Sequence, residues 1–372
     1  MTSASPSLAR NGGAFLFSVS IMKFAALLLL STSPALLAVE LVVGSPKTEH
    51  IREPFSVDFD AQGTMYGVEF TKSNRVFQWN NDKLTFIAGV QHNAEKQKAA
   101  ADVFDGSDPL KAVFNGMHDI QITKAGNAII GDSFNHRVRL LELPSGKVST
   151  LAGNGKTSFA GDGGPATAAS FNITMTATLS PDEKHLLIAD IGNHRTRTID
   201  LGTGIVQTVA GNGQRGLPVD GANALDTPMG DTRAVTQAAD GTIYVLLRGG
   251  NSLVEVKGGK VRTVVNAGGK NGYSGDGGPG REATMNGPKY VAMDAAGNVL
   301  ICDTENHCVR RYAPTTEKIE LIAGAPPKKG TTIGDTWLNT QLSRPHGVRI
   351  APDGQLYIAD TYNNRVLRGV YR

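Results

Sequence analysis

The segment IADIGNHRTRTIDL, residues 188–201, is the stretch that decides the fold. An apolar run leads into a polar turn, and a second run then alternates between polar and apolar residues. Such runs on both sides of a tight turn predict a β-hairpin. Related hairpins occur at 130–143, 301–312 and 358–369. The hairpin is therefore one part of an internal repeat.

The repeat recurs six times at intervals of 56 to 62 residues, counted at the residue that follows the hairpin arginine or its equivalent. These six positions are Val76, Val138, Thr196, Leu253, Val309 and Val366. The third copy reads as four short strands, TATLS, LLIAD, TRTIDL and VQTVAG, within residues 176–211. Four antiparallel strands in each of six units predict an all-β fold, a six-bladed β-propeller.

The sixth copy ends after its third strand, VLRGVYR, so its blade lacks a fourth strand. The segment VELVVG at 39–44 resembles the fourth strands of the other copies. Because an unclosed ring would leave an exposed strand edge, we expect 39–44 to close the ring. Residues 39–372 then form a single propeller. Its blades are expected at approximately 53–90, 115–155, 171–213, 228–269, 286–325 and 342–372, the last completed by 39–44.

The hairpin sequences resemble NHL repeats, a family named for Asn-His-Leu at this position. The resemblance covers about 53–372 and recurs in register, although the first copy is weak and the fourth lacks both the Asp and the Arg. It implies a six-bladed propeller. The resemblance does not identify the function, because many members of the family are binding scaffolds and one branch, peptidyl-hydroxyglycine lyase, is a zinc enzyme.

Composition excludes some classes of protein. The 372 residues carry a formal net charge of +3 and no basic block, which argues against nucleic-acid binding. Two cysteines are too few for a disulfide framework. No segment after the N-terminal region approaches the length of a transmembrane helix, so no membrane span is expected in the mature chain.

Residues 1–38 are predicted to be an export signal with an upstream extension. Met22-Lys23 precedes a short apolar run and then small residues suited to cleavage near Ala35 or Ala38. Either Met1 or Met22 is then the true start. The alternative is an uncleaved anchor. We expect the mature protein to be periplasmic or extracellular.

The loops that join successive copies each contain an Asp next to a Gly. These residues are Asp105, Asp162, Asp220, Asp276 and Asp335. A phosphate-binding loop would open a helix, and none follows here. A calcium site needs several oxygen ligands, which one Asp supplies only if neighbouring loops cooperate. We predict structural joints in which Gly adopts positive φ and Asp accepts hydrogen bonds from turn N–H groups.

These joints, the second-to-third hairpins and the starts of the innermost strands should share one face, which we expect to be the functional surface. We place Asp162 and Asp276 on this long-loop face. The innermost strands should begin at the mouth of the central channel, with Phe55, His118, Met175, Arg233, Lys289 and His346 in equivalent positions. Asp119, Thr176 and Tyr290 lie one step further in.

Four of these six mouth residues carry basic side chains, which favours an anionic group such as a carboxylate. The binding residues predicted on the mouth and the loop face are His118, Asp119, Arg233, Lys289, Tyr290, His346, Asp162 and Asp276. The alternative is that several mouth side chains turn aside and pair with the joint Asp residues.

His118 in MHDI and His346 in RPHGV resemble the segments that hold zinc in the lyase branch. This resemblance makes them candidate metal ligands, with zinc or calcium as the cofactor. A catalytic zinc wants three protein ligands, and no third His occupies an equivalent position. The lyase would also need a Tyr and an Arg, for which Tyr290 and Arg233 are candidates without a motif match.

Other recurrent polar residues are expected to be structural. The hairpin histidines, which recur with the repeat, are predicted to pack the turn, and an Asp–Arg pair is predicted to bridge it. The histidines are His136, His194 and His307, and the pairs are Asp132/Arg137, Asp190/Arg195 and Asp360/Arg365.

The two cysteines, Cys302 and Cys308, lie on either side of one hairpin turn. We predict a cross-strand disulfide between them, which would suit an exported protein. The alternatives are two reduced thiols or an accidental metal-binding pair.

The leading prediction of function is an exported binding or scaffold module that holds a protein, peptide or glycan on its long-loop face. The alternative is an enzyme, a metal-dependent lyase or lactonase-like hydrolase at the channel mouth. A third metal ligand near His118 and His346 would distinguish them. A purely structural module in a larger assembly would show neither a pocket nor a bound ion.

Overall fold

The computed structural model describes residues 38–45, 50–93, 100 and 102–371. They belong to one compact unit, Leu36–Arg372. Residues 1–37 of the predicted export signal, including the cleavage position near Ala35, lie outside the described residues. The alternative cleavage position near Ala38 stays a prediction. Within the described part of the chain, no helix is both long and apolar enough to cross a membrane.

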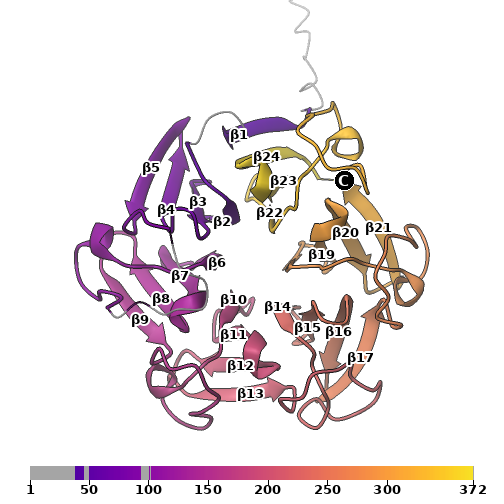
Figure 1. The fold of residues 1–372 in the computed structure, drawn as a ribbon, viewed down its shortest axis with the longest axis horizontal. Coiled ribbons are helices and arrows are strands. Elements are labelled where there is room, and N and C mark those ends of the chain that lie inside the picture. The colour runs from indigo at the N-terminus through magenta and orange to yellow at the C-terminus, as the bar shows by residue number, and fades with distance from the viewer. Residues whose placement is uncertain (1–37, 46–49, 94–99, 101, 372) are drawn as a thin grey trace, which may run out of the picture. The chain divides into compact units, whose positions relative to one another are not determined.

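The described residues form six antiparallel sheets of four strands, arranged radially around a central axis (Figure 1). The predicted six-bladed propeller is therefore confirmed. Blade 1 comprises β2 (Pro54–Phe59), β3 (Met65–Glu69), β4 (Val76–Asn80) and β5 (Lys83–Ala88). Blade 2 comprises β6 (Met117–Ile122), β7 (Asn127–Asp132), β8 (Arg137–Glu142) and β9 (Val148–Ala152). Blade 3 comprises β10 (Thr174–Leu179), β11 (His185–Asp190), β12 (Arg195–Asp200) and β13 (Val206–Ala210).

The remaining blades repeat this order. Blade 4 comprises β14 (Thr232–Gln237), β15 (Ile243–Leu247), β16 (Ser252–Lys257) and β17 (Lys260–Val265). Blade 5 comprises β18 (Tyr290–Met293), β19 (Val299–Asp303), β20 (Cys308–Ala313) and β21 (Lys318–Ala323). Blade 6 comprises β22 (Gly347–Ile350), β23 (Gln355–Asp360), β24 (Arg365–Val370) and β1 (Glu40–Gly44).

Short 3-10 helices form parts of the connections. Four occupy hairpins between second and third strands: η2 (Ser133–Asn135), η4 (Ile191–Asn193), η6 (Thr304–Asn306) and η8 (Thr361–Asn363). Four occupy the joints between blades: η1 (Pro109–Lys111), η3 (Ala166–Ala168), η5 (Gly280–Glu282) and η7 (Trp337–Asn339).

The N-terminal strand closes the ring, as the missing strand of the sixth copy predicts. β1 pairs antiparallel with β24, and Glu40 lies opposite Arg368. The Arg368 guanidinium also donates to the Glu40 carboxylate at 3.0 Å. Figure 1 shows β1 as the outer strand of blade 6.

The hydrophobic core is divided among the interfaces between blades. Six buried clusters each combine apolar residues from two adjacent sheets. The cluster between blades 6 and 1 contains Val43, Ile51, Val57 and Val366. Because neighbouring sheets pack face to face in this way, each blade depends on both neighbours.

The hairpin histidines connect neighbouring blades, which agrees with a packing role. The backbone at His136 and His194 is left-handed, with φ of 55° and 51°. The Nδ1 atom of His136 accepts from the backbone N–H of Ile173, at the start of blade 3, at 3.0 Å. His307 accepts likewise from the N–H of Arg344, at the start of blade 6, at 3.1 Å.

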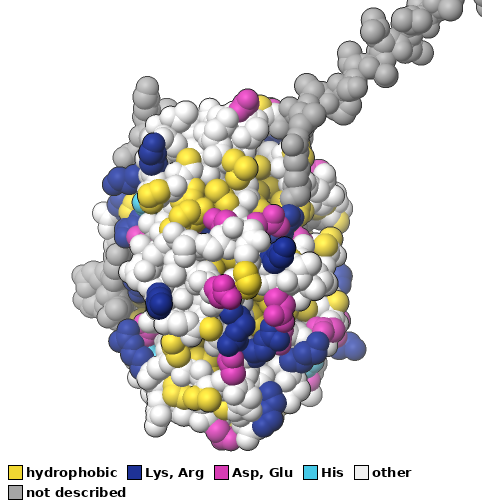
Figure 2. All heavy atoms as spheres, turned by 90° about the vertical axis from the view of Figure 1, so that its right-hand side faces the viewer, with side chains coloured by type: hydrophobic (Ala, Val, Ile, Leu, Met, Phe, Trp, Pro, Cys, Tyr) yellow, Lys and Arg dark blue, Asp and Glu magenta, His cyan; other side chains and the backbone are white. Residues whose placement is uncertain are grey.

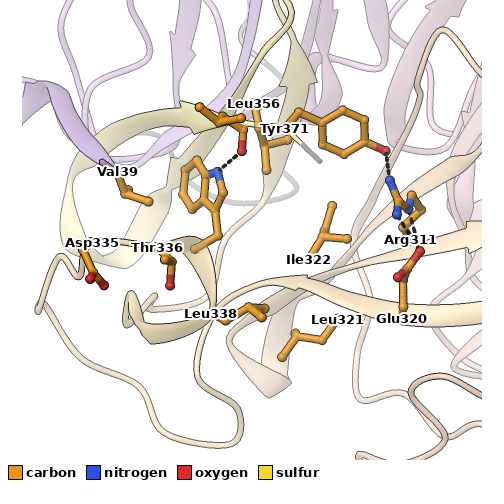
Figure 3. Close-up of a pocket in the computed structure, with 12 residues that line it drawn as sticks. Val39, Arg311, Glu320, Leu321, Ile322, Asp335, Thr336, Leu338, Leu356 and Tyr371 are labelled. Carbon is orange, nitrogen blue, oxygen red and sulfur yellow. Dashed lines mark hydrogen bonds and ion pairs between the residues drawn. The ribbon is translucent and has the colours of Figure 1, made fainter. Parts of the chain in front are cut away.

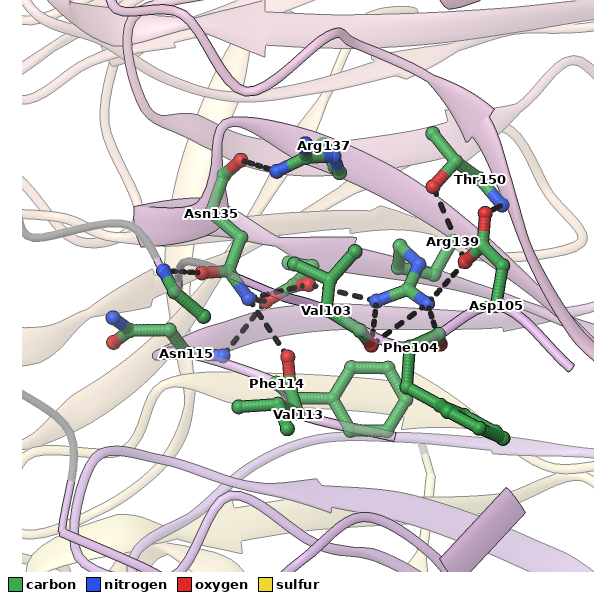
Figure 4. Close-up of polar contacts among 12 residues, drawn as sticks. Val103, Phe104, Asp105, Val113, Phe114, Asn115, Asn135, Arg137, Arg139 and Thr150 are labelled. Atoms are coloured by element: carbon green, nitrogen blue, oxygen red, sulfur yellow. Dashed lines mark hydrogen bonds and ion pairs between the residues drawn. The ribbon is translucent and has the colours of Figure 1, made fainter. Parts of the chain in front are cut away.

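The predicted Asp–Arg pairing is correct in blade 6 and wrong in blades 2 and 3. Arg365 binds Asp360 at 2.7 Å. In blade 2, however, Asp132 lies 3.4 Å from Arg139, and Arg137 donates to the backbone carbonyl of Asn135 instead (Figure 4). Blade 3 repeats this arrangement with Asp190, Arg197 and Arg195. Residues two positions apart on a strand share a face, so both arginines lie on the same side of the sheet. The second arginine reaches the Asp, and the first donates to carbonyls of the turn.

The joint Asp residues are structural, but their partners are mainly side chains of the outer strands. Asp162 accepts from Arg197 at 2.6 Å and from the hydroxyl of Thr208 at 2.6 Å. Asp105 binds Arg139 at 2.6 Å in the same way (Figure 4). The joints of Asp105 and Asp162 are thereby connected to the third and fourth strands of the blades that follow them.

The predicted disulfide is not formed, which corrects the expectation from the sequence. Cys302 and Cys308 are both buried free thiols. The strand register explains why, because Cys302 lies opposite Val309 and Cys308 lies opposite Asp303. Directly paired residues share a face and successive residues alternate. The two thiols therefore point to opposite faces of the sheet.

Candidate functional site

Six side chains from different blades lie close to one another around the central axis of the propeller. They come from the starts of the innermost strands: Phe55, His118, Met175, Arg233, Lys289 and His346. Ring contacts link Phe55 to His118 at 4.5 Å and to His346 at 4.2 Å between centroids. The Arg233 guanidinium lies 5.8 Å from the Phe55 centroid. Because Arg233 lies on β14 of blade 4 and Phe55 on β2 of blade 1, on opposite sides of the central axis in Figure 1, this contact crosses that axis. We call these six residues the mouth ring.

β-Bulges direct several of these side chains. The register of β2 against β3 shifts between Pro54 and Ser56, which leaves Phe55 outside the regular pairing. His118 and Arg233 occupy the corresponding shifts in blades 2 and 4. A bulge inserts an extra residue and re-aims its side chain. The repeated bulges thus turn side chains from the sheet faces toward the channel.

Arg233 is the most unusual member of the mouth ring. Only 6% of its surface is exposed, and its Nε atom is buried without a hydrogen-bond partner. Its guanidinium donates to the sulfur of Met175, a weak acceptor. Within the described residues it forms no ion pair with a carboxylate. Burial, with the nearby positive charge of Arg248, lowers its pKa to about 9.

The cations of blades 5 and 6 share one acidic residue. Glu305 binds Lys289 at 2.7 Å and Arg344 at 2.6 Å. Burial lowers the pKa of Lys289 to about 8 despite this ion pair, and the charges of Arg233 and Arg344 contribute to the shift. Positive charge therefore exceeds negative charge on this side of the mouth.

An aromatic arc occupies the opposite side of the mouth. Phe70 lies 4.8 Å from Phe55 and 4.7 Å from His118, again between ring centroids. Phe134 lies 5.7 Å from His118. The arc continues to His346 and then to Tyr362, 6.0 Å further on. We define the aromatic arc as Phe55, Phe70, His118, Phe134, His346 and Tyr362.

Beneath the mouth ring, Asp119 joins several blades through hydrogen bonds. It accepts from the hydroxyl of Tyr290 at 2.8 Å and of Ser56 at 3.1 Å. The backbone N–H of Ala177 donates to its other oxygen at 3.1 Å. Complete burial raises the pKa of Asp119 to about 6, although the charge of Arg349 opposes this rise. These hydrogen bonds link blades 1, 2, 3 and 5 next to the mouth ring.

The two mouth histidines do not complete a metal site. Nδ1 of His118 lies 2.7 Å from the carbonyl of Gly116, and Nδ1 of His346 lies 2.8 Å from that of Arg344. Each Nδ1 therefore carries the proton. Burial and the charges of Lys289 and Arg233 hold the pKa of His346 well below its usual value. Among the described residues, no three His, Cys, Asp or Glu side chains converge to hold a metal, and the adjacent cations would repel one. The donor set does not fit zinc or calcium.

The other predicted loop-face residues lie apart from the mouth ring. Asp162 and Asp276 bind Arg197 on β12 and Arg310 on β20, the third strands of blades 3 and 5. The alternative prediction, that mouth side chains pair with joint Asp residues, is therefore wrong, because other arginines hold these carboxylates.

A separate cavity of about 270 Å³ lies at the rim between blades 5 and 6 (Figure 3). Its wall is largely apolar and includes Val39, Leu338 and Leu356. On its polar side, Arg311 binds Glu320 and the hydroxyl of Tyr371. The charged groups and the hydroxyl in this wall therefore bind one another. Figure 2 shows basic and acidic side chains interspersed on this side of the molecule rather than a continuous basic patch.

Comparison with known proteins agrees with the observed repeat. Residues 285–312 and 342–368 match the family model described as NHL repeat. The chain is an NHL-repeat propeller. The chloroplastic protein SUPPRESSOR OF QUENCHING 1 of Arabidopsis thaliana is 27% identical over 270 residues. The alignment covers 69% of this chain and 25% of the relative, so the NHL propeller spans about a quarter of that relative's length.

Solved structures share the fold of this NHL propeller at low identity. An auxiliary nutrient binding protein from Bacteroides thetaiotaomicron has a TM-score of 0.63 and 13% identity, covering 89% of this chain and 76% of that one. Virginiamycin B lyase from Staphylococcus aureus has a TM-score of 0.52 and 11% identity, covering 90% and 99%. These likenesses show the fold alone, because a propeller hosts unrelated functions.

Sequence reasoning found the mouth ring but missed residues that surround it. Phe134, Glu305 and Tyr362 occupy the second position after the Asp that ends the second strand in their blades. This shared register was the signal that could have placed them at the mouth. Arg344 occupies the left-handed position two residues before the mouth residue, as Ile173 and Asp231 do in their blades, but the residue type there varies. Phe70 had no such signal, because the second strand of blade 1 ends in Glu69 rather than in an Asp.

Proposed function

We propose that this NHL propeller is an exported binding module whose channel mouth holds a carboxylate of a peptide, protein or glycan. The observation that supports the proposal most strongly is the buried Arg233 guanidinium, which lacks a carboxylate partner among the described residues. A guanidinium offers two parallel N–H donors that match a carboxylate. Lys289 supplies a second positive charge nearby. A bound carboxylate would relieve the cost of burying both charges.

The metal-dependent lyase or hydrolase is not retained as a second candidate. Its feature would be a third ligand near His118 and His346, and the described residues provide none. Fold similarity does not support the enzyme hypothesis over the binding hypothesis, because the structural relatives include a binding protein as well as a lyase. The proposal therefore rests on the chemistry of the mouth.

Replacing Arg233 with Met is expected to raise the free energy of unfolding of the ligand-free protein by about 0.5–2 kcal/mol. The substitution removes a buried charge that has no anionic partner, and Met fills a similar volume. Burial lowers the pKa of Arg233 below its unfolded value, so the guanidinium is charged at neutral pH and the full cost of burying that charge is present there. Urea unfolding at pH 7 measures it. A decrease in stability would instead assign Arg233 a structural role.

Binding of a simple carboxylate is expected to weaken as the pH rises through about 8, where Lys289 loses its positive charge. Calorimetric titration with N-acetylalanine, and with its uncharged amide as the control ligand, tests this. The carboxylate should bind the wild type and the amide should not. Arg233→Met should abolish the binding at every pH. Equal binding of acid and amide, or full binding by Arg233→Met, would contradict the proposed function.

A further inference from the structure

The mouth divides into two chemically different halves. Blades 4 and 5 supply the cations Arg233, Arg248 and Lys289, whereas blades 1 and 2 supply aromatic rings. Blade 6 supplies both kinds of group, because Arg344 lies over the ring of Tyr362. Within the arc, contacts run continuously from Tyr362 through His346 to Phe55. Phe55 then contacts the Arg233 guanidinium. A path of ring surfaces thus leads from the outside of the mouth to the buried positive charge.

The outer end of this path is open to solvent. Tyr362 is 49% exposed, although its neighbours His346 and Phe55 are buried. Its ring lies 5.0 Å below the Arg344 guanidinium, and the same arginine is held by Glu305 at 2.6 Å. These contacts orient Tyr362 before any ligand arrives. An exposed, oriented aromatic ring beside a polar neighbour is typical of a recognition surface rather than of a core.

We propose that the mouth selects a carboxylate joined by a short linker to an aromatic ring. This inference rests on the proposed function and narrows its ligand class. The carboxylate binds Arg233 and Lys289, while the ring packs against Tyr362 and the adjacent arc. Offset or edge-to-face contact between rings adds about 0.5–1.5 kcal/mol beyond the burial of area. A free aromatic acid and the C-terminal aromatic residue of a peptide both carry this chemistry.

The aromatic contribution can be separated from the anionic one with small probes. Calorimetry compares N-acetylphenylalanine, N-acetylalanine and N-acetylphenylalaninamide on the full-length protein. N-acetylphenylalanine is expected to bind about tenfold more tightly than N-acetylalanine, and the amide is expected not to bind. A longer peptide that ends in Phe distinguishes the two sources. If it binds more tightly than N-acetylphenylalanine, the source is a peptide terminus; weaker binding indicates a free aromatic acid.

Tyr362→Ala provides the matching variant, because the side chain is exposed and its removal should leave the fold intact. It is expected to weaken N-acetylphenylalanine binding about tenfold and to change N-acetylalanine binding less than about twofold. Phe159→Ala, at another exposed aromatic residue in the joint of Asp162, is the control and should change neither.

The outcomes separate the inference from the proposed function. If N-acetylalanine binds as tightly as N-acetylphenylalanine, or if Tyr362→Ala weakens both equally, the aromatic preference is wrong and the carboxylate site stands. If neither acid binds in an Arg233-dependent manner, both proposals are overturned. Binding of the amide as tightly as the acid would likewise overturn both.

Discussion

Replacing Arg197 with Met is expected to lower the free energy of unfolding by about 3–5 kcal/mol. The side chain is 0% exposed and lies between the buried Asp190 and the joint residue Asp162. It also donates to the backbone carbonyls of Ser170 and Ala160. Met keeps much of the volume but leaves Asp190 buried without its cation and these carbonyls without their donor.

Urea unfolding of both proteins at neutral pH measures this loss. Arg215→Met is the matched control, since Arg215 is 69% exposed and pairs with Asp231 near the surface. Exposed ion pairs contribute at most about 1 kcal/mol. Similar losses for the two variants would show that the buried network around Arg197 does not hold the joint to its blade.

Replacing Val43 with Asp is expected to destabilise the propeller by about 3–5 kcal/mol, because it places an unpaired charge in the core between blades 6 and 1. Val43 is 5% exposed and packs in the cluster with Ile51, Val57 and Val366. The same change at Leu41, on the same strand but 48% exposed, should cost less than about 1 kcal/mol.

Thermal unfolding of the two variants tests whether β1 is a genuine fourth strand of blade 6. A large difference between Val43→Asp and Leu41→Asp is expected, because only one side chain faces the core. If both variants unfold at the wild-type temperature, the closing strand contributes little to stability and the ring is held by other contacts.

The number of blades and the ring closure could be predicted because both follow from counting strands in a repeat. The partner of Asp132 could not. Arg137 and Arg139 share one face of β8, so periodicity cannot choose between them, and only the geometry of the turn does. Blade 6 differs at the second of these two positions, where Leu367 replaces the arginine. Arg365, at the first position, binds Asp360 instead.

The position of the candidate site in the fold could be predicted, but the directions and contacts of its side chains could be predicted only in part. Equivalent positions in each repeat identified Arg233 and His346 at the mouth. The bulge that frees Arg233 from regular pairing has no signal in a single sequence, and neither does the contact that carries it across the channel to Phe55. The disulfide prediction failed for a related reason, because it depended on whether Cys302 and Cys308 share a face, which changes with a one-residue shift in register.

The pairing of β1 with β24 also sets the order in which this chain can fold. Glu40 and Arg368 are separated by 328 residues, so blade 6 remains incomplete until almost the entire propeller has been synthesised. Contacts this distant in sequence form slowly. Until β1 pairs with β24, the edge of β24 is open to the first strand of another copy. Refolding at high protein concentration should therefore yield strand-swapped oligomers in competition with closed monomers.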